Sequence, residues 1–196
     1  MEMAVKKEIE IKLKIEDINT IREKIISLGA VFIGKEKQVD EHFDFENNTL
    51  KEQHKTVRIR NKKIFCFKKG QHIKNNKKIH DEYEFQIDNY DPFILFLSEI
   101  GIKRTYIKEK IRESFKIEMT NTLLIEIDIL PFGNFIEIEG EDKDIDLCAE
   151  KLSFKREDFI SESYIRLYEK YCKENNLEYT KNILFTKENK QHENND

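Results

Sequence analysis

The stretch Glu8-Ile9-Glu10-Ile11-Lys12-Leu13 alternates charged and apolar residues without a break. Successive side chains of a β-strand point to opposite faces, so this stretch predicts a strand with one charged face and one apolar face. Four further stretches show the same alternation: Arg58-Ile59-Arg60, Glu82-Tyr83-Glu84, Lys110-Ile111-Arg112 and Glu137-Ile138-Glu139. The chain therefore predicts several strands that each present charges to one side of a sheet.

The sign of these charges is sorted by strand, with acids on the first, fifth, seventh and eighth predicted strands and bases on the third, fourth and sixth. An ordinary antiparallel sheet with one wet face is the alternative for any single strand. An open sheet of about eight strands, however, tends to curl, split or close. We therefore predict an α+β fold, an eight-stranded antiparallel closed β-tunnel with a charged interior and helices packed outside. The predicted interior charges are Glu8, Glu10, Glu82, Glu84, Glu126, Asp128, Glu137 and Glu139, with Lys12, Arg58, Arg60, Lys68, Lys110 and Arg112.

Apolar periodicity and end signals predict the helices. Asp17 is a candidate N-cap for a helix that ends at Gly29, and Asp91-Pro92 opens a second helix that ends at Gly101. Residues 142–152 and 157–175 predict two more helices. The lysine-rich stretch 70–78 predicts a mobile basic loop between two strands.

Length and charge limit the class of protein. The 196 residues suit one compact domain, here 1–176, followed by a polar tail, 177–196, that we expect to be disordered toward its end. Because 35 Lys and Arg face 39 Asp and Glu, we expect no nucleic-acid partner. Three widely spaced cysteines and the lack of an 18-residue apolar run predict a cytoplasmic protein without a membrane partner.

A tunnel that holds so many charges predicts a charged ligand. Arginine clusters suit phosphate oxygens, which favours a polyphosphate. Carboxylates beside a polyanion would repel it unless they hold hard divalent cations that bridge them to the phosphates. The sequence therefore predicts a complex of a metal ion with a polyphosphate, held by side chains because no Gly-rich phosphate loop is present.

These residues together resemble the CYTH, or triphosphate tunnel metalloenzyme, superfamily. The motifs that carry the resemblance are Glu8-x-Glu10-x-Lys12, Gln38-x-Asp40, Arg58-x-Arg60, Lys68, Glu82-x-Glu84, Lys110-x-Arg112, Asp128 and Gly133-x-Phe135-x-Glu137-x-Glu139. The resemblance implies an eight-stranded tunnel that binds a triphosphate with Mg²⁺ or Mn²⁺. It is closest to class IV adenylyl cyclase-like members, which convert ATP to cyclic AMP and pyrophosphate.

The resemblance also implies roles. The residues that would grip the triphosphate and serve catalysis are Lys12, Arg58, Arg60, Lys68, Lys110 and Arg112. The residues that would bind the metal are Glu8, Glu10, Asp128, Glu137 and Glu139. Glu82 and Glu84 would support them, through further ligation or by pairing with arginines. The alternatives are a solvated surface for the bases and internal salt bridges for the acids.

Three functions stay open at this point. The first is the cyclase, the second a triphosphatase that hydrolyses inorganic tripolyphosphate or thiamine triphosphate, and the third a non-catalytic module that binds a polyphosphate or nucleotide. Tyr164 is interpreted as a packing residue and the histidines as structural or surface groups. A homodimer through an outer face is a further possibility.

Overall fold

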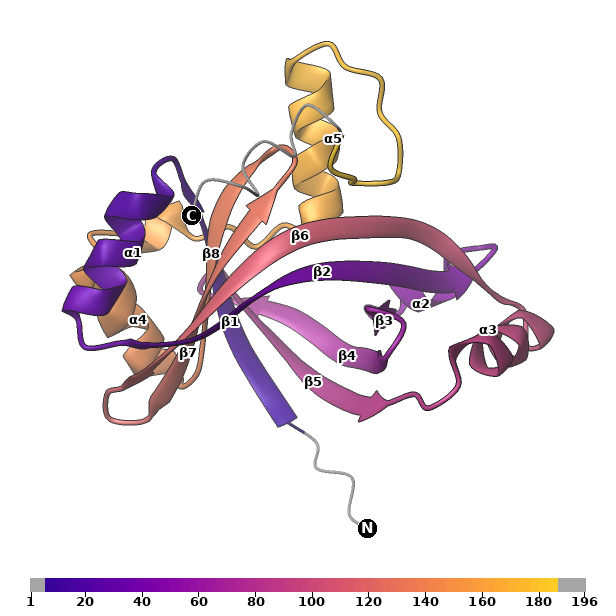
Figure 1. Ribbon diagram of the computed structural model, residues 1–196, viewed down its shortest axis with the longest axis horizontal. Helices are drawn as coiled ribbons and strands as arrows, with labels where there is room; N and C mark the ends of the chain where they lie inside the picture. The colour runs from indigo at the N-terminus through magenta and orange to yellow at the C-terminus, as the bar shows by residue number, and fades with distance from the viewer. Residues whose placement is uncertain (1–5, 187–196) are drawn as a thin grey trace.

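The computed structural model describes residues 6–186, and within them eight strands form a closed antiparallel barrel (Figure 1). The predicted fold class is confirmed. Around the barrel the order is β1-β5-β4-β3-β2-β6-β7-β8, and β8 closes onto β1. The strands are β1 (Lys6–Ile15), β2 (Val31–Phe45), β3 (Thr56–Arg60), β4 (Ile64–Lys74), β5 (Lys77–Gln86), β6 (Ile102–Glu118), β7 (Thr122–Leu130) and β8 (Gly133–Glu139).

The described chain also forms five α-helices and a short 3-10 helix. They are α1 (Ile18–Ser27), α2 (Thr49–Glu52), α3 (Tyr90–Glu99), α4 (Asp142–Lys151), the 3-10 turn Arg156–Asp158 and α5 (Tyr164–Glu174). Asp17 caps α1 as predicted, because its carboxylate accepts from the backbone N–H groups of Asn19 and Thr20. Within residues 6–186 no helix combines the length and apolar character that crossing a membrane would need.

The helix predicted over 157–175 begins later, at Tyr164. Before it, Phe159 is buried in the core, and the backbone N–H of Ile160 donates to the carbonyl of Lys12 at 2.8 Å. Tertiary packing thus holds the segment between the 3-10 turn and α5 out of the helix.

The alternation along β1 divides its side chains between core and cavity. Ile11 and Leu13 point outward and are buried against Ile25 of α1 and Ile145 of α4. Burying one such side chain stabilises the fold by about 1.5–3 kcal/mol. A second apolar cluster lies under α3, where Leu97 packs with Ile59 and Phe43. The outward faces of the strands therefore provide the core, and the inward faces remain for the charges.

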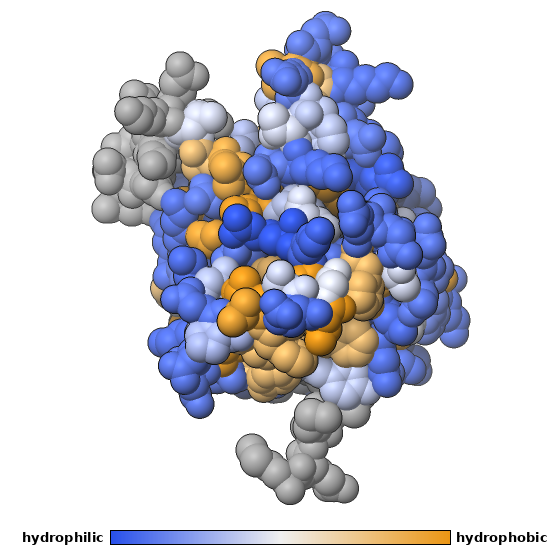
Figure 2. Space-filling model, turned by 90° about the vertical axis from the view of Figure 1, so that its right-hand side faces the viewer, coloured by the Kyte–Doolittle hydropathy of each residue, from blue (hydrophilic) through white to orange (hydrophobic). Residues whose placement is uncertain are grey.

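Apolar side chains also reach the surface near α3, at the end of the molecule that faces the viewer in Figure 2. Phe85, Leu95, Phe96 and Ile100 are exposed large apolar residues in this part of the chain. Phe93 joins this surface to the cluster under α3, because its ring packs edge-on to Phe85 and beside Phe96. The apolar surface is thus an outward extension of that cluster.

The prediction of a mobile loop over 70–78 is wrong, because β4 and β5 extend through these residues as a hairpin. Lys74 pairs with Lys77, so only Asn75 and Asn76 form the turn. Both have positive φ, 53° and 60°, which is the backbone of a two-residue hairpin turn. The strands therefore continue to the turn, and Lys77 and Lys78 are buried.

The segment after α5 returns to the barrel. Ile183 is fully buried, its N–H donates to the carbonyl of Ile107, and its carbonyl accepts from the N–H of Glu109. This segment thereby pairs with β6 at Lys108. The pairing of β6 with β7 begins further along β6, at Ile111. The boundary at residue 176 stays a prediction, and the end of the tail, 187–196, lies outside the described residues.

Candidate active site

The inward faces of the strands enclose a cavity of about 300 Å³. The structure brings the predicted site residues together around it, although they come from seven strands and are up to 131 positions apart, from Glu8 to Glu139. Asp128 is fully buried and is not among the lining residues. The lining residues predicted from the sequence are Glu8, Glu10, Lys12, Arg58, Arg60, Lys68, Glu82, Glu84, Lys110, Arg112, Glu126, Glu137 and Glu139.

One group of charges lies between β1, β4 and β5. The Nζ atom of Lys68 is 3.1 Å from Oε1 of Glu8 and 3.4 Å from Oε1 of Glu82. Burial raises the pKa of Glu8 to about 10, and the hydrogen bond to Glu82 adds to the rise. Glu10 behaves oppositely: burial opposes its ionisation, but Lys68, Lys78 and Lys12 outweigh burial and lower the pKa of Glu10 to about 2.

A second group surrounds Asp128. Its Oδ2 accepts from Lys110 Nζ at 2.9 Å and from the Tyr164 hydroxyl at 2.9 Å, and it lies 2.6 Å from a guanidinium nitrogen of Arg112. Arg112 also donates to Glu137 at 2.5 Å. Asp128 thus orients two cations of the lining from a buried position, and its predicted metal ligation would require it to exchange these partners.

A third group surrounds Asp40, which is fully buried. Its oxygens lie 3.1 Å from Arg60 Nε, 3.6 Å from Arg58 Nε and 3.1 Å from Lys108 Nζ. Burial lowers the pKa of Lys108 to about 8. Arg58 also reaches Glu84 at 3.4 Å, which fits the supporting role predicted for that carboxylate.

Sequence reasoning missed several residues of the cavity. Lys108 lies two residues before Lys110 on the same face of β6, so the alternation could have identified it. Lys78 and His80 precede Glu82 at the same spacing, but the expected loop concealed the first of them. Tyr164 lines the cavity instead of only packing, and the ring lies 4.1 Å from Lys12 Nζ.

Two histidines that were interpreted as structural or surface groups also line the cavity. His42 stacks on Tyr106 with 4.2 Å between ring centroids. His80 lies across from Glu8, in register on β5, with 3% of its surface exposed. Burial lowers the pKa of His80 to about 4, so its imidazole is neutral at pH 7.

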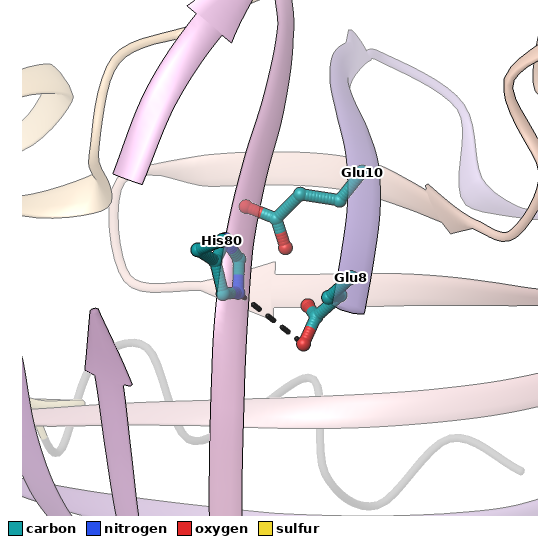
Figure 3. Close-up of side chains that lie close together, drawn as sticks. All are labelled: Glu8, Glu10 and His80. Carbon is teal, nitrogen blue, oxygen red and sulfur yellow. Dashed lines mark ion pairs between the residues drawn. The ribbon is translucent and has the colours of Figure 1, made fainter. Parts of the chain in front are cut away.

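The donors on β1 and β5 fit a divalent cation. One ligand atom each from Glu8, Glu10 and His80 lies within 4.8 Å of the others, and Figure 3 shows the two carboxylates directed toward the imidazole. Carboxylate oxygens are the ligands that Mg²⁺ and Mn²⁺ prefer. The ammonium of Lys68 lies beside Glu8 and Glu82, so Glu8 already borders one cation.

Comparison with known proteins agrees with this geometry. The model of the CYTH domain family matches residues 6–165. A curated protein from Methanocaldococcus jannaschii, named "Putative adenylate cyclase MJ0240", is 30% identical over 172 residues, which cover 82% of this chain and 97% of that protein.

Solved structures share the fold. The PH1012 protein from Pyrococcus horikoshii OT3 has a TM-score of 0.67 at 27% identity, over 82% of this chain and 98% of that chain. A "putative adenylate cyclase" from Vibrio parahaemolyticus gives 0.70 at 17% identity, over 84% and 98%. A Hippeastrum protein described as "Putative adenylyl cyclase HpAC1", with a dominant triphosphatase activity, gives 0.59 at 16% identity, over 89% and 98%.

Enzymes of the CYTH family act on triphosphates and generally need divalent metal ions. The bases inside the closed barrel suit phosphate oxygens, and the carboxylates among them suit a divalent cation. The family model covers well over half of the chain, and the Methanocaldococcus relative spans a similar share. The chain therefore belongs to the CYTH domain family.

Proposed function

We propose that this protein is a class IV adenylyl cyclase-like enzyme, which converts ATP to cyclic AMP and pyrophosphate in the tunnel with Mg²⁺ or Mn²⁺. The observation that carries the proposal is the lining of one cavity by both bases and carboxylates. The 30% identical relative, whose name is "Putative adenylate cyclase MJ0240", supports the choice of reaction.

Each base of the cavity that would meet a phosphate is held by a carboxylate. Lys68 contacts Glu8, Arg58 contacts Asp40, and Lys12 lies 3.3 Å from Glu137. A divalent cation held by Glu8 and Glu137 would take these partners from Lys68 and Lys12, which would then be available to phosphate oxygens. A triphosphate would pair with the bases of the lining while its metal ion pairs with the carboxylates. Neither the triphosphate nor the metal ion alone could neutralise both kinds of charge.

The bases bind and orient the triphosphate. We assign this role to Lys12, Arg58, Arg60, Lys68, Lys110 and Arg112, and the metal to Glu8, Glu10, Asp128, Glu137 and Glu139. A bound divalent cation would acidify the attacking hydroxyl and neutralise charge on the phosphates. Glu82 and Glu84 hold Lys68 and Arg58 in place. Charge that develops on the leaving pyrophosphate is stabilised by cations already in position.

The cyclase reaction also needs a place for adenosine. His42 and Tyr106 form a neutral, flat pair in the cavity, with the ring planes 8° apart. His42 is directly across from Arg58 in the register of β2 and β3. A base that stacked here would lie beside a phosphate-binding arginine, and this neighbourhood supports a nucleotide as the substrate.

A triphosphatase is the second candidate. The phosphate-binding half of the site serves hydrolysis of tripolyphosphate or thiamine triphosphate equally well, because water then replaces the ribose hydroxyl as the nucleophile. The fold itself is compatible with this reaction, since the Hippeastrum protein is described as a dominant triphosphatase. A non-catalytic polyphosphate-binding module is the third candidate, and turnover would exclude it.

The test is to incubate the protein with Mg²⁺ or Mn²⁺ and, separately, ATP, thiamine triphosphate and tripolyphosphate. Products are followed by phosphorus NMR and chromatography, with Glu10→Ala as the inactive control. Cyclic AMP with pyrophosphate supports the cyclase. Orthophosphate without cyclic AMP supports the triphosphatase, and binding without any product leaves the module as the function.

A further inference from the structure

His80 is placed to bind a metal ion. It faces Glu8 across the β1–β5 pairing, and its Nε2 lies 3.3 Å from Oε2 of Glu8. Only 3% of the surface of His80 is exposed. Neither ring nitrogen has a hydrogen-bond partner among residues 6–186. Buried polar groups without a partner are rare, and each calls for an explanation such as an ion or a water.

From this geometry we infer that His80 is a nitrogen ligand, which completes a site with Glu8 and Glu10 that prefers Mn²⁺ and other first-row transition ions to Mg²⁺. The inference deepens the proposed function and rests on its assignment of Glu8 and Glu10 to the metal. All three side chains point toward one volume of the tunnel (Figure 3).

The chemistry of the donors sets the preference. Mg²⁺ favours oxygen ligands and keeps several waters, whereas Mn²⁺, which also takes carboxylates, belongs to the first-row transition series, whose ions bind nitrogen donors more readily than Mg²⁺ does. A site with two carboxylates and one imidazole therefore gains affinity for Mn²⁺ that it does not gain for Mg²⁺. A purely structural role for His80 would require a hydrogen bond, and the 3.3 Å contact with Glu8 does not satisfy hydrogen-bond geometry.

The ammonium of Lys68 occupies the opposite side of Glu8, 3.1 Å from Oε1. An ion bound between Glu8, Glu10 and His80 would weaken this contact, because its charge repels the ammonium. Lys68 would then be free to meet the phosphates. Metal binding through His80 thus prepares the neighbouring base for the substrate.

The experiment is electron spin echo spectroscopy of Mn²⁺ bound to the full chain without substrate. We expect modulation from a directly bound ¹⁴N in the wild-type protein, replaced by the ¹⁵N pattern when histidine is labelled with ¹⁵N. His80→Asn should lose the modulation, and its Mn²⁺ dissociation constant should rise about tenfold or more. The dissociation constant for Mg²⁺ should change less than about threefold.

Two matched variants locate the nitrogen. His72→Asn changes an exposed histidine on β4, and His42→Asn changes the other described histidine of the tunnel lining. Both should keep the ¹⁴N modulation. Modulation that survives in His80→Asn, or that disappears in His42→Asn, overturns the assignment.

The wild-type spectra alone separate this inference from the proposed function, so the test stands even if His80→Asn does not fold. Bound Mn²⁺ without nitrogen modulation overturns the role of His80 and leaves the carboxylate site intact. Failure of the protein to bind Mn²⁺ at all overturns both the role of His80 and the metal-dependent enzyme.

Discussion

Replacing Asp40 with asparagine removes one charge on which three cations depend. Its oxygens lie 3.1 Å from Arg60, 3.6 Å from Arg58 and 3.1 Å from Lys108. At an effective dielectric constant of about 20, each pair is worth roughly 5 kcal/mol before the cost of desolvation. Because removing one partner of a buried pair costs about 3–5 kcal/mol, we expect Asp40→Asn to lower the free energy of unfolding by that amount.

The pH dependence of this effect has a definite sign. Although burial opposes its ionisation, Arg58, Lys108 and Arg60 hold the pKa of Asp40 well below its usual range. A carboxyl whose pKa is depressed in the folded protein contributes stability above its unfolded pKa, about 3.9, and loses it as the pH falls through the folded pKa. The difference in the free energy of unfolding between wild type and Asp40→Asn should therefore have its largest value at neutral pH and decrease only below about pH 4.

Urea unfolding followed by circular dichroism measures the loss, with Asp88→Asn as a control at an exposed carboxylate. Saturating tripolyphosphate should restore part of the stability of Asp40→Asn, because the anion replaces the missing charge. A loss below about 1 kcal/mol, the value of a surface pair, would refute the idea that Asp40 holds the three cations together.

The other predictions concern catalysis, pH and the C-terminal segment. Glu10→Ala and Arg60→Ala should each lower triphosphate turnover about 10²-fold or more while circular dichroism shows an intact fold, and unfolding of both would favour structural salt bridges. Since burial lowers the pKa of Lys108 to about 8, its charge is lost as pH rises through that value. Calorimetry should then show weaker tripolyphosphate binding above pH 8 than below it, with a smaller change in Lys108→Arg, whose charge persists. Ile183→Ala should cost about 2–4 kcal/mol in urea unfolding, and a cost near zero would show that its contact with β6 does not stabilise the barrel.

Much of the barrel was predictable because period-two alternation is a local signal. In β1 every second residue from Lys6 to Lys14 is charged, and β8 ends in Glu137-Ile138-Glu139, so the direction of each side chain follows from its position. Segregation of charge by strand argued against an ordinary solvated face, and the number of strands then predicted closure, which no single strand could show. The site residues assembled for the same reason, since all of them except Asp128 line the cavity.

The missed features depend on local conformation or on distant contacts. The hairpin from β4 to β5 depends on two asparagines with positive φ, and polar composition suggested a loop instead. His80 has no partner near it in the sequence, because its register with Glu8 is set by strands 72 positions apart. Tyr164 reaches Asp128 only because the segment before α5 is held in the core.

The tunnel resolves a conflict between folding and function. Cations exposed to one another would repel and leave the barrel unstable before a ligand arrives, so the carboxylates inside it are needed for folding as well as for chemistry. Asp40 is fully buried among its cations and does not border the cavity, while Glu8 and Glu10 do. A carboxylate buried beneath its cations can keep them while they bind phosphate. One that borders the cavity can exchange its cation for a metal. This division explains how one set of residues can stabilise the folded tunnel and still release its bases to a triphosphate.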